Sequence, residues 1–376
     1  MNFETSAVHA GHVNDQSAGS VINPIYLSTT FERDEKGNVA PKGFTYSRIA
    51  NPNRSGLETK LAILEQGAEA MAFSSGMAAT MAVCQALLGP QAHVIISDDC
   101  YHGVAHLIKK MYARWGVTYS EVDMTYPVNI QKAITADTKL ILVETPSNPL
   151  LKIADIEAIC SIAKIRKVAV ACDNTWATPY IIKPLTLGAD YVIHSSTKYF
   201  GGHSDIIGGC VIVKETNEIS QRLREYQTIG GVVPSPFDCW LLDRSIATLP
   251  LRMAAHTKNA SVIANYLSTH SKIERVYYPE LPTHVNHEVA KRQMKGIYGG
   301  MLSVLVKGGR KEAMDFANHL SVFRHATSLG GVESLIEHRL TSEGENPKSP
   351  ENLLRLSIGI EHIDDLLNDI KKALES

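Results

Sequence analysis

The sequence lacks the features that mark membrane and secreted proteins. No run of about eighteen apolar residues occurs, so we expect no segment to span a bilayer. The first residues, Met1-Asn-Phe-Glu-Thr-Ser, include an acid and no apolar stretch, and we expect no secretory leader there. The six cysteines have no paired spacing, which is typical of reduced thiols in a cytoplasmic protein.

Charge of either sign is not in excess, and the common metal motifs are missing. The formal net charge is −2 at pH 7, which gives no reason to expect nucleic acid or a membrane surface as a partner. His194, His203 and Asp205 are close in sequence, but no H-E-x-x-H or paired C-x-x-C supports a metal site. A chain of 376 residues, 44% of them hydrophobic, predicts a globular protein of two or three domains.

Apolar runs alternate with helical patterns through the middle of the chain. This alternation predicts an α/β fold with a doubly wound, mostly parallel sheet. The expected strands are residues His93–Ser97, Lys139–Glu144, Lys167–Cys172, Asp190–His194 and Gly209–Val213. A helical period that includes Leu57 and Leu61 precedes them and ends at Gly67.

The pattern divides the chain into three parts. Residues 1–56 lack steady periodicity and form an arm, for which a partner subunit is one possible resting surface. Residues 57–237 form the α/β domain. Residues 238–376 begin with a long helix, Asp238–Leu267, and continue as a smaller α+β domain. There the expected strands are Gly299–Val306 and Leu353–Ile358, and the expected final helix is Ile363–Leu374.

Lys198 is the candidate catalytic residue, because it follows the end of a buried strand. Ser195, Ser196 and Thr197 precede it, and two glycines follow. A partly desolvated lysine can act as an amine nucleophile, and hydroxyl groups beside it can bind a phosphate. Pyridoxal phosphate requires this combination. A solvated surface lysine is the alternative, whereas an S-x-x-K hydrolase would need Ser-Asp-Asn and Lys-Thr-Gly, which do not occur.

Other polar residues fall where strands end or helices begin. The carboxyl ends of parallel strands meet at one edge of a sheet, which is where such sheets bind ligands. A Ser-Gly turn at a helix start can bind phosphate through free N–H groups. Taken singly, an exposed loop tyrosine or an aspartate helix cap would explain some of these residues. The set expected at one edge is Ser75, Gly76, Tyr101, Asn148, Asp173 and Lys198.

Together these motifs resemble the Cys/Met metabolism family of pyridoxal-phosphate enzymes, which have the fold-type I architecture. The resemblance runs from about Val21 to the C-terminus. It rests on Tyr46-Ser-Arg48, Ser75-Gly76-Met77, Glu144-Thr-Pro-Ser-Asn-Pro149, Asp173-Asn-Thr175, Ser195-Ser-Thr-Lys198-Tyr-Phe-Gly-Gly-His-Ser-Asp205, Ser328-Leu-Gly-Gly331 and Leu354-Arg355-Leu-Ser. The motifs match in order and in spacing.

The resemblance implies a role for each matching residue. Lys198 would form the Schiff base with the cofactor and move protons, Asp173 would pair with the pyridine nitrogen, and Tyr101 would stack on the ring. Arg355 would hold the substrate α-carboxylate. The implied cofactor-binding residues are Gly76, Met77, Tyr101, Asn148, Asp173, Thr175, Ser195, Thr197 and Lys198, with Tyr46 and Arg48 from a neighbouring subunit. The implied substrate-binding residues are Arg355, Ser328, Glu333 and Asn148.

The resemblance also implies an activity on small amino acids. We expect an elimination like that of cystathionine γ-lyase, through a carbanion at Cα and a vinylglycine intermediate. A cystathionine γ-synthase, a methionine or homocysteine γ-lyase, and a non-catalytic binding protein on the same fold are the alternatives. A homo-oligomer with shared active sites, commonly a dimer of dimers, is implied as well.

The sequence departs from the family pattern at three places. His106 stands where the family usually has an arginine, five residues after the stacking tyrosine. Gly103 stands where methionine γ-lyases have a cysteine. A His-Pro-x-x-Met-Thr-His run is replaced by His338-Arg-Leu-Thr-Ser-Glu-Gly-Glu-Asn-Pro347. These departures leave the exact substrate and the roles of His106 and Arg339 open.

Overall fold

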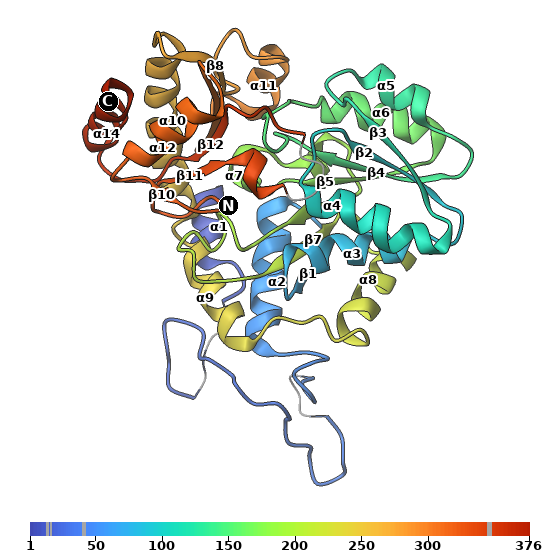
Figure 1. The fold of residues 1–376 in the computed structure, drawn as a ribbon. Helices are drawn as coiled ribbons and strands as arrows, with labels where there is room; N and C mark the ends of the chain where they lie inside the picture. Colours follow the sequence, from blue (N-terminus) through green and yellow to red (C-terminus); the bar gives the residue numbers. More distant parts are fainter. Residues whose placement is uncertain (13–14, 16, 40–42, 344–347) are drawn as a thin grey trace.

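The chain forms two sheets, each with its own helices (Figure 1). The structure is a computed structural model, and it describes all residues except 13–14, 16, 40–42 and 344–347. The larger sheet has the order β1-β7-β6-β5-β4-β2-β3, in which β7 runs antiparallel to both of its neighbours and the other pairs are parallel. Its strands are β1 (Glu69–Phe73), β2 (His93–Ser97), β3 (Thr118–Val122), β4 (Thr138–Glu144), β5 (Ala169–Asp173), β6 (Tyr191–His194) and β7 (Gly209–Val213).

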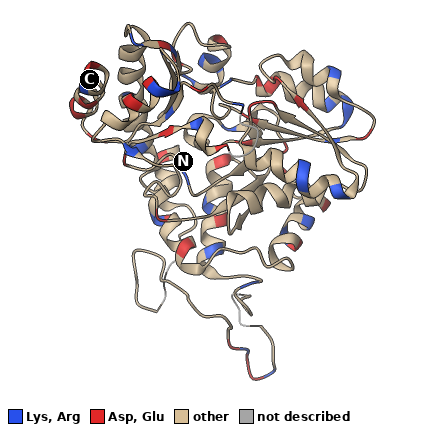
Figure 2. Ribbon diagram, in the orientation of Figure 1, with Lys and Arg blue, Asp and Glu red and all other residues tan. Residues whose placement is uncertain are grey.

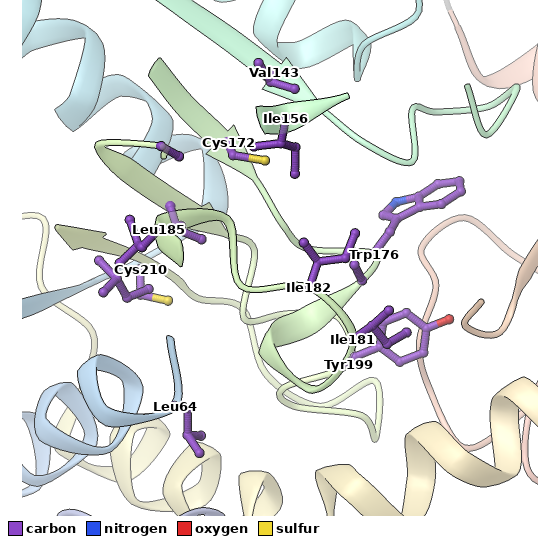
Figure 3. Packing of buried hydrophobic residues seen from close by; sticks show 14 of the residues in the cluster. Leu64, Val143, Ile156, Cys172, Trp176, Ile181, Ile182, Leu185, Tyr199 and Cys210 are labelled. Carbon is purple, nitrogen blue, oxygen red and sulfur yellow. The ribbon is translucent and has the colours of Figure 1, made fainter. Parts of the chain in front are cut away.

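Helices cover both faces of this sheet, because its strands are apolar on both sides. Ile95 packs into one hydrophobic cluster, whereas its neighbours Val94 and Ile96 pack into the other. One face packs against α2 (Pro52–Glu65), α5 (Pro127–Ala133), α6 (Ile156–Arg166), α7 (Thr178–Ile181), η3 (Pro184–Leu187) and α9 (Pro236–Ile246), as Figure 3 shows in part. The other packs against α3 (Gly76–Leu87), α4 (His102–His106), η1 (Leu107–Met111), η2 (Tyr112–Trp115) and α8 (Glu218–Thr228).

The C-terminal domain is a smaller sheet covered by helices. Its strand order is β10-β11-β12-β9-β8, and the pair β10–β11 is parallel while the other pairs are antiparallel. The strands are β8 (Ile273–Tyr277), β9 (Met301–Val306), β10 (Arg324–His325), β11 (Leu335–His338) and β12 (Leu353–Ser357). The helices are α10 (Leu249–Ser268), α11 (His287–Met294), α12 (Arg310–His319), α13 (Arg339–Ser342) and α14 (Ile363–Glu375).

Two predictions about helices need correction. The expected single helix Asp238–Leu267 is two helices, α9 and α10, separated at residues 247–248. Pro250 explains the break, because a proline ring clashes with the carbonyl four residues earlier, here that of Ile246 at the end of α9. Helix α2 begins at Pro52 rather than at Leu57, since the Asn51 side chain caps it by accepting a hydrogen bond from the Asn53 N–H at 2.9 Å.

The five strands predicted for the larger sheet are all present, but β1 and β3 were missed. Strand β1 is Glu-Ala-Met-Ala-Phe, a sequence of modest strand propensity, and it is held by pairing with β7. Strand β3 lies at the sheet edge and is largely unburied, so it has no apolar run. In the C-terminal domain β8, β10 and β11 were not predicted either, whereas β9, β12 and α14 were.

The N-terminal segment leaves the body of the molecule after α1 (Phe3–His9) and returns to it at α2 (Figure 1). Several of its apolar side chains are exposed, among them Val21 at 90% and Leu27 at 68%. Lysine, arginine, aspartate and glutamate are interspersed over both domains in Figure 2. Within the described residues, none of the helices combines the length and apolarity that crossing a bilayer requires.

Candidate active site

The predicted site residues meet at the carboxyl end of the larger sheet. Strands β4, β5 and β6 are parallel neighbours, and Glu144 and Asp173 lie opposite each other at the ends of β4 and β5. Lys198 follows the end of β6, and Tyr101 follows β2. The convergence at this edge was predicted from the sequence, and the strand order explains it.

These residues line one cavity of about 510 Å³ between the two domains. All of the predicted cofactor and substrate residues reach it except Tyr46, Arg48 and Glu333. The lining also includes Glu144, Trp176 and Glu337, which were not predicted as site residues, and Arg339, whose role the sequence left open. The predicted residues in the lining are Gly76, Met77, Tyr101, Asn148, Asp173, Thr175, Ser195, Thr197, Lys198, Ser328 and Arg355.

The amine of Lys198 is held in the half-buried wall of this cavity. Its Nζ donates a hydrogen bond to the Ser328 hydroxyl at 2.8 Å. Burial lowers the pKa of Lys198 to about 8, and the positive charge of Arg355 acts in the same direction. A neutral amine is therefore accessible near neutral pH, which a nucleophile for an aldehyde requires.

Asp173 presents a carboxylate to the cavity floor. Its Oδ1 accepts a hydrogen bond from the Thr175 N–H at 3.0 Å. Burial raises the pKa of the Asp173 carboxyl, and burial followed by the charge of Asp173 raises the pKa of Glu144 well above its usual range. A cationic ring nitrogen placed here would relieve the burial penalty of Asp173.

The first turn of α3 offers a seat for a phosphate. Ser75 caps the helix by accepting a hydrogen bond from the Ala78 N–H at 3.0 Å, and the N-terminus carries the positive end of the helix dipole. Gly76 is required here because an added Cβ would lie 2.7 Å from the Cβ of Ser195. The hydroxyl of Thr197 bonds the backbone of Gly208, accepting from its N–H at 3.0 Å.

We therefore expect Gly76→Ala to weaken cofactor binding. The added methyl group pushes Ser195 away from the helix start, and overpacking of this kind costs about 1–3 kcal/mol, which is about 5–150-fold in a dissociation constant. Titration of the apoprotein with pyridoxal phosphate measures this dissociation constant. Gly89→Ala, where a Cβ meets nothing within 4 Å, is the control and should bind as the wild type does. Equal affinities for all three proteins would contradict the phosphate seat.

Tyr101 lines the cavity, and the Glu144 carboxylate holds its backbone. The Tyr101 N–H donates to the Glu144 carboxylate at 2.8 Å, while the side chain remains 39% exposed. A Cβ at Gly103 would lie 2.5 Å from the Tyr101 ring. Glycine at position 103 therefore lets the ring lie against the start of α4.

Arg355 of β12 is buried and lines the same cavity. Its guanidinium donates to Asn148 Oδ1 at 2.9 Å and to the Ser328 carbonyl at 3.0 Å, and it forms an ion pair with Glu337. Burial lowers the pKa of Arg355 to about 10. The prediction that Arg355 points away from the apolar face of its strand is confirmed, because Leu354 and Leu356 lie in the hydrophobic core.

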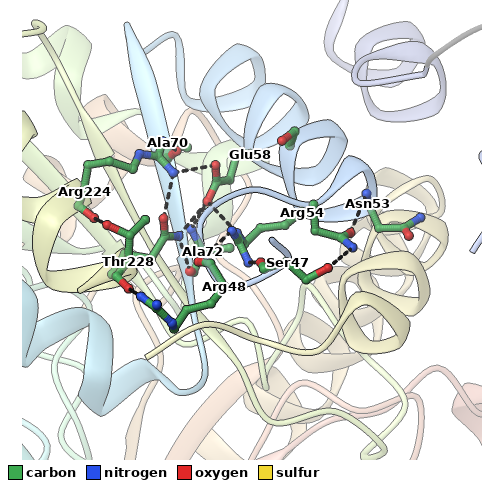
Figure 4. Close-up of polar contacts among 12 residues, drawn as sticks. Ser47, Arg48, Asn53, Arg54, Glu58, Ala70, Ala72, Arg224 and Thr228 are labelled. Carbon is green, nitrogen blue, oxygen red and sulfur yellow. Dashed lines mark hydrogen bonds and ion pairs between the residues drawn. The ribbon is translucent and has the colours of Figure 1, made fainter. Parts of the chain in front are cut away.

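Three predicted residues lie outside the cavity. Glu333 contacts the Ser204 hydroxyl instead, so its role in substrate binding stays a prediction. Arg48 donates to the Thr228 carbonyl at 2.5 Å (Figure 4). Its guanidinium carbon lies 5.5 Å from the Tyr46 ring centroid. His106 lines an adjoining hollow, and residues 344–347 of the divergent run lie outside the described residues.

Glu337 is the main functional candidate that the sequence reasoning missed. It lies on β11 directly opposite Arg355 of β12, in the register of the antiparallel pair. Alternation of side chains along residues 335–338 could have indicated that Glu337 and Leu335 share one face of a strand. The sequence could not have indicated that Arg355 lies opposite Glu337. Among the described residues, no group of three or more His, Cys, Asp or Glu side chains could hold a metal ion.

The arrangement fits pyridoxal phosphate at each end of that molecule. The Lys198 amine could bond the aldehyde, and the Asp173 carboxylate could pair with the ring nitrogen. The start of α3, where Gly76 approaches Ser195 closely, could bind the phosphate. Arg355 lines the same cavity beside Asn148, and it is a cation that a carboxylate of a bound amino acid would meet there.

Comparisons with known proteins support the same assignment. The family model for "Cys/Met metabolism PLP-dependent enzyme" matches residues 4–375. The chain is 47% identical to cystathionine gamma-synthase of Mycobacterium tuberculosis, covering 98% of this chain and 96% of that protein. It is 44% identical to cystathionine gamma-lyase of Dictyostelium discoideum, covering 99% and 97%. The crystal structure of metB from Corynebacterium glutamicum superposes with a TM-score of 0.97 at 42% identity, covering 100% and 98%. The chain belongs to the Cys/Met metabolism family of pyridoxal-phosphate-dependent enzymes.

Proposed function

We propose that this enzyme breaks the bond between Cγ and the heteroatom of a homoserine-derived amino acid, with cleavage of cystathionine as the leading reaction. One observation carries the proposal. The Lys198 amine, with a pKa lowered to about 8, shares a cavity with the Asp173 carboxylate and the Arg355 fork. Relatives named cystathionine gamma-synthase and cystathionine gamma-lyase support this substrate class.

Each residue has a physical task in this reaction. When bound, the cofactor supplies an electron sink for the carbanion at Cα. Arg355 and Asn148 bind the substrate α-carboxylate, which fixes the Cα–H bond relative to Lys198. The Lys198 amine takes the Cα proton and delivers protons to the leaving group, and positioned proton transfers are worth about 10²–10⁴-fold each. Asp173 keeps the ring nitrogen protonated by its negative charge.

The synthase reaction is the second candidate, because the relatives at 47% identity bear that name. The two reactions share the loss of the γ-substituent and differ in the fate of the remaining carbon chain. A lyase adds water overall and releases cysteine, ammonia and 2-oxobutanoate from cystathionine. A synthase lets the thiol of cysteine add at Cγ and releases the acyl group of an O-acylhomoserine as a carboxylate.

Product identification tests the proposal. The holoenzyme is incubated with L-cystathionine, with L-methionine, with L-cysteine, and with an O-acyl-L-homoserine with or without cysteine. Release of 2-oxobutanoate and cysteine from cystathionine is the expected result. Cystathionine formation from the O-acylhomoserine, without cleavage of added cystathionine, would select the synthase reaction. Pyruvate and homocysteine from cystathionine would mean cleavage at Cβ and would refute the γ-reaction.

We also propose that the enzyme is a homo-oligomer whose active sites are shared between subunits, commonly as a dimer of dimers. The arm displays exposed apolar side chains, including Val21 and Leu27, which a partner surface would cover. Arg48 and Tyr46 lie outside the cavity of their own chain, and the Arg48 side chain donates only to a backbone carbonyl, that of Thr228, among the contacts of the described residues, so a partner's phosphate could replace this bond. The end of the arm is held to α2, because the Arg54 side chain donates a hydrogen bond to the Ser47 carbonyl at 2.8 Å (Figure 4).

Mixing two inactive variants tests shared sites. We expect Arg48→Ala and Lys198→Ala to be defective separately, because each lacks a different part of every site. After the two are dissociated and reassembled together, a hybrid dimer contains one complete site, so roughly a quarter of wild-type activity should return by random pairing. Sedimentation of the wild type measures the number of subunits. Activity that stays at the level of the separate variants would contradict sharing.

A cytoplasmic location is proposed on the chemistry of the thiols. All six cysteines are free, and five of them are buried. Thiols in this state are typical of a reducing compartment. Fractionation of the host cell with an antibody against the protein tests the proposal, and recovery outside the cytoplasm would contradict it.

A further inference from the structure

Glu65 is a buried acid that the reaction described above does not use. It is the last residue of α2, and its exposed fraction is 0%. Its Oε1 accepts a hydrogen bond from the Asn174 amide at 3.0 Å and lies 2.6 Å from His194 Nε2. Its other oxygen, Oε2, is buried and has no hydrogen-bond partner among the described residues. All three side chains are buried, so water does not screen their charges.

This contact joins the ends of two neighbouring strands of the larger sheet. Asn174 directly follows Asp173 at the end of β5, and its N–H donates to the Ile193 carbonyl of β6 at 3.0 Å. Ile193 lies opposite Asp173 in the parallel register, and His194 is the last residue of β6. His194 therefore lies one residue beyond the position opposite Asp173, and only Asp173 of the two lines the cavity.

The proton between Glu65 and His194 is expected on the histidine. Imidazole is the stronger base by a factor of about 10² in water. Glu65 Oε1 also accepts from Asn174, and an ionised oxygen is the better acceptor for two donors. A neutral histidine would leave the carboxylate as an unbalanced buried charge, which is strongly unfavourable. The contacts therefore favour an imidazolium paired with a carboxylate.

His194 is the cation closest to Glu65 among the titratable groups that face this acid. Cys172 and Cys210 also face it, but burial raises the pKa of both thiols well above its usual range, so they are neutral. Lys183 is a second cation on this side, and its pKa is lowered by burial. In the part of the chain that the structure describes, the only ion pair of Glu65 is with His194.

On the cavity side, Asp173 faces one further acid and one further cation. Burial raises the pKa of Asp173, whereas hydrogen bonds from Thr175 and then positive charge on His194 and Lys198 oppose that rise. Glu144 adds little negative charge, because burial and then the charge of Asp173 raise its pKa well above its usual range. Burial lowers the pKa of Lys198 to about 8, so its charge is readily lost. The charge on His194 is the one that a buried carboxylate holds in place.

We propose that Glu65 and His194 are positioning residues that act through Asp173: Glu65 holds a positive charge on His194, and this charge keeps Asp173 ionised opposite the ring nitrogen of the cofactor. Asp173 and the ring nitrogen share one proton, and a cation behind Asp173 favours the nitrogen as its site. With an uncharged residue at position 194, the proton moves to the carboxyl group, and the ring withdraws electrons less strongly. This inference rests on the proposed pairing of Asp173 with the ring nitrogen and is independent of which substrate is cleaved.

Nitrogen-15 NMR of the holoenzyme, loaded with pyridoxal phosphate labelled at the ring nitrogen, tests the inference. The resonance distinguishes a protonated from a neutral pyridine, and the wild type should be protonated at neutral pH. His194→Gln keeps a donor for Glu65 without the charge, and Glu65→Gln keeps an acceptor without the charge. In both variants the ratio of protonated to neutral ring nitrogen should fall by about 10-fold or more. Glu65→Asp retains the charge and should retain part of the ratio.

Glu58→Gln is the matched control, since Glu58 is a buried acid on the same helix. It accepts from the Ala72 N–H at 2.9 Å and pairs with Arg224 at 2.7 Å, outside the cavity. This variant should lose stability and keep the wild-type ratio. Asp173→Asn should lose the ring proton, and a proton retained there would refute both the pairing and the inference. A ratio lowered by Asp173→Asn but unchanged in His194→Gln would overturn the inference alone.

Neutron diffraction from crystals of the wild-type holoenzyme tests the same point without a variant. Hydrogen should be found on both ring nitrogens of His194 and on neither oxygen of Glu65. A neutral imidazole, or a proton on Glu65, would overturn the inference whether or not the variants fold. The product assay reports separately on the cleavage reaction, so an enzyme inactive on homoserine derivatives would refute that reaction and leave these proton positions to be judged by themselves.

Discussion

Lys198→Ala should lower kcat for the cleavage reaction by about 10⁴-fold, since it removes the covalent anchor and a proton carrier together. The amine is held at 2.8 Å from the Ser328 hydroxyl, and burial lowers its pKa to about 8. Among the described residues that line the cavity, Lys198 is the only lysine. The variant should also lose the visible absorbance of the bound cofactor after dialysis. Steady-state kinetics and the absorption spectrum measure the two effects.

Lys183→Ala is the matched control for this variant. Lys183 is also half-buried with a pKa lowered by burial, but it lies over the Phe3 ring at 5.2 Å and outside the cavity. It should leave both kcat and the spectrum unchanged. A small primary amine added to Lys198→Ala should restore part of the rate, because it replaces the missing base. Full activity of Lys198→Ala would show that Lys198 is neither the covalent anchor of the cofactor nor the proton carrier.

The strands that hold this lysine were predictable because both faces of them are buried. Strands β2, β4, β6 and β7 read as continuous apolar runs, and their ends were located to within one or two residues. Strand β1 was not, because Ala70 and Ala72 have little strand preference and pair only through the distant β7. Local sequence is therefore enough to predict the buried central strands, whereas β1 depends on its pairing with β7.

The same difference separates the predicted and missed parts of the site. Asp173, Asn148 and Lys198 end or follow strands of one parallel sheet, so their meeting follows from the order of the pattern. Glu337 reaches Arg355 through the register of β11 with β12 in the other domain, which no local pattern specifies. Arg339 shares the Glu337 carboxylate with Arg355, and this contact depends on the same register.

Asp173→Asn should be the second most damaging change, lowering kcat/KM by about 10²–10³-fold. The amide has the size of the carboxylate and can still accept the 3.0 Å hydrogen bond from the Thr175 N–H, so the fold should persist. It cannot carry the negative charge, and breaking a buried ion pair by removing one partner costs about 3–5 kcal/mol. The ring nitrogen then loses its proton, and the carbanion at Cα is less stabilised.

Asp190→Asn separates this electrostatic role from a structural one. Asp190 precedes β6, and its carboxylate accepts a hydrogen bond from the N–H of Val170 on β5 at 2.9 Å. Like Asp173 it therefore accepts a backbone hydrogen bond, but it does not line the cavity. Its pKa is likewise raised by burial. We expect Asp190→Asn to keep wild-type kcat/KM and Asp173→Glu to recover part of the activity lost in Asp173→Asn. If Asp173→Asn and Asp190→Asn reduced kcat/KM equally while unfolding at the same temperature as the wild type, the carboxylate of Asp173 would not be the partner of the ring nitrogen.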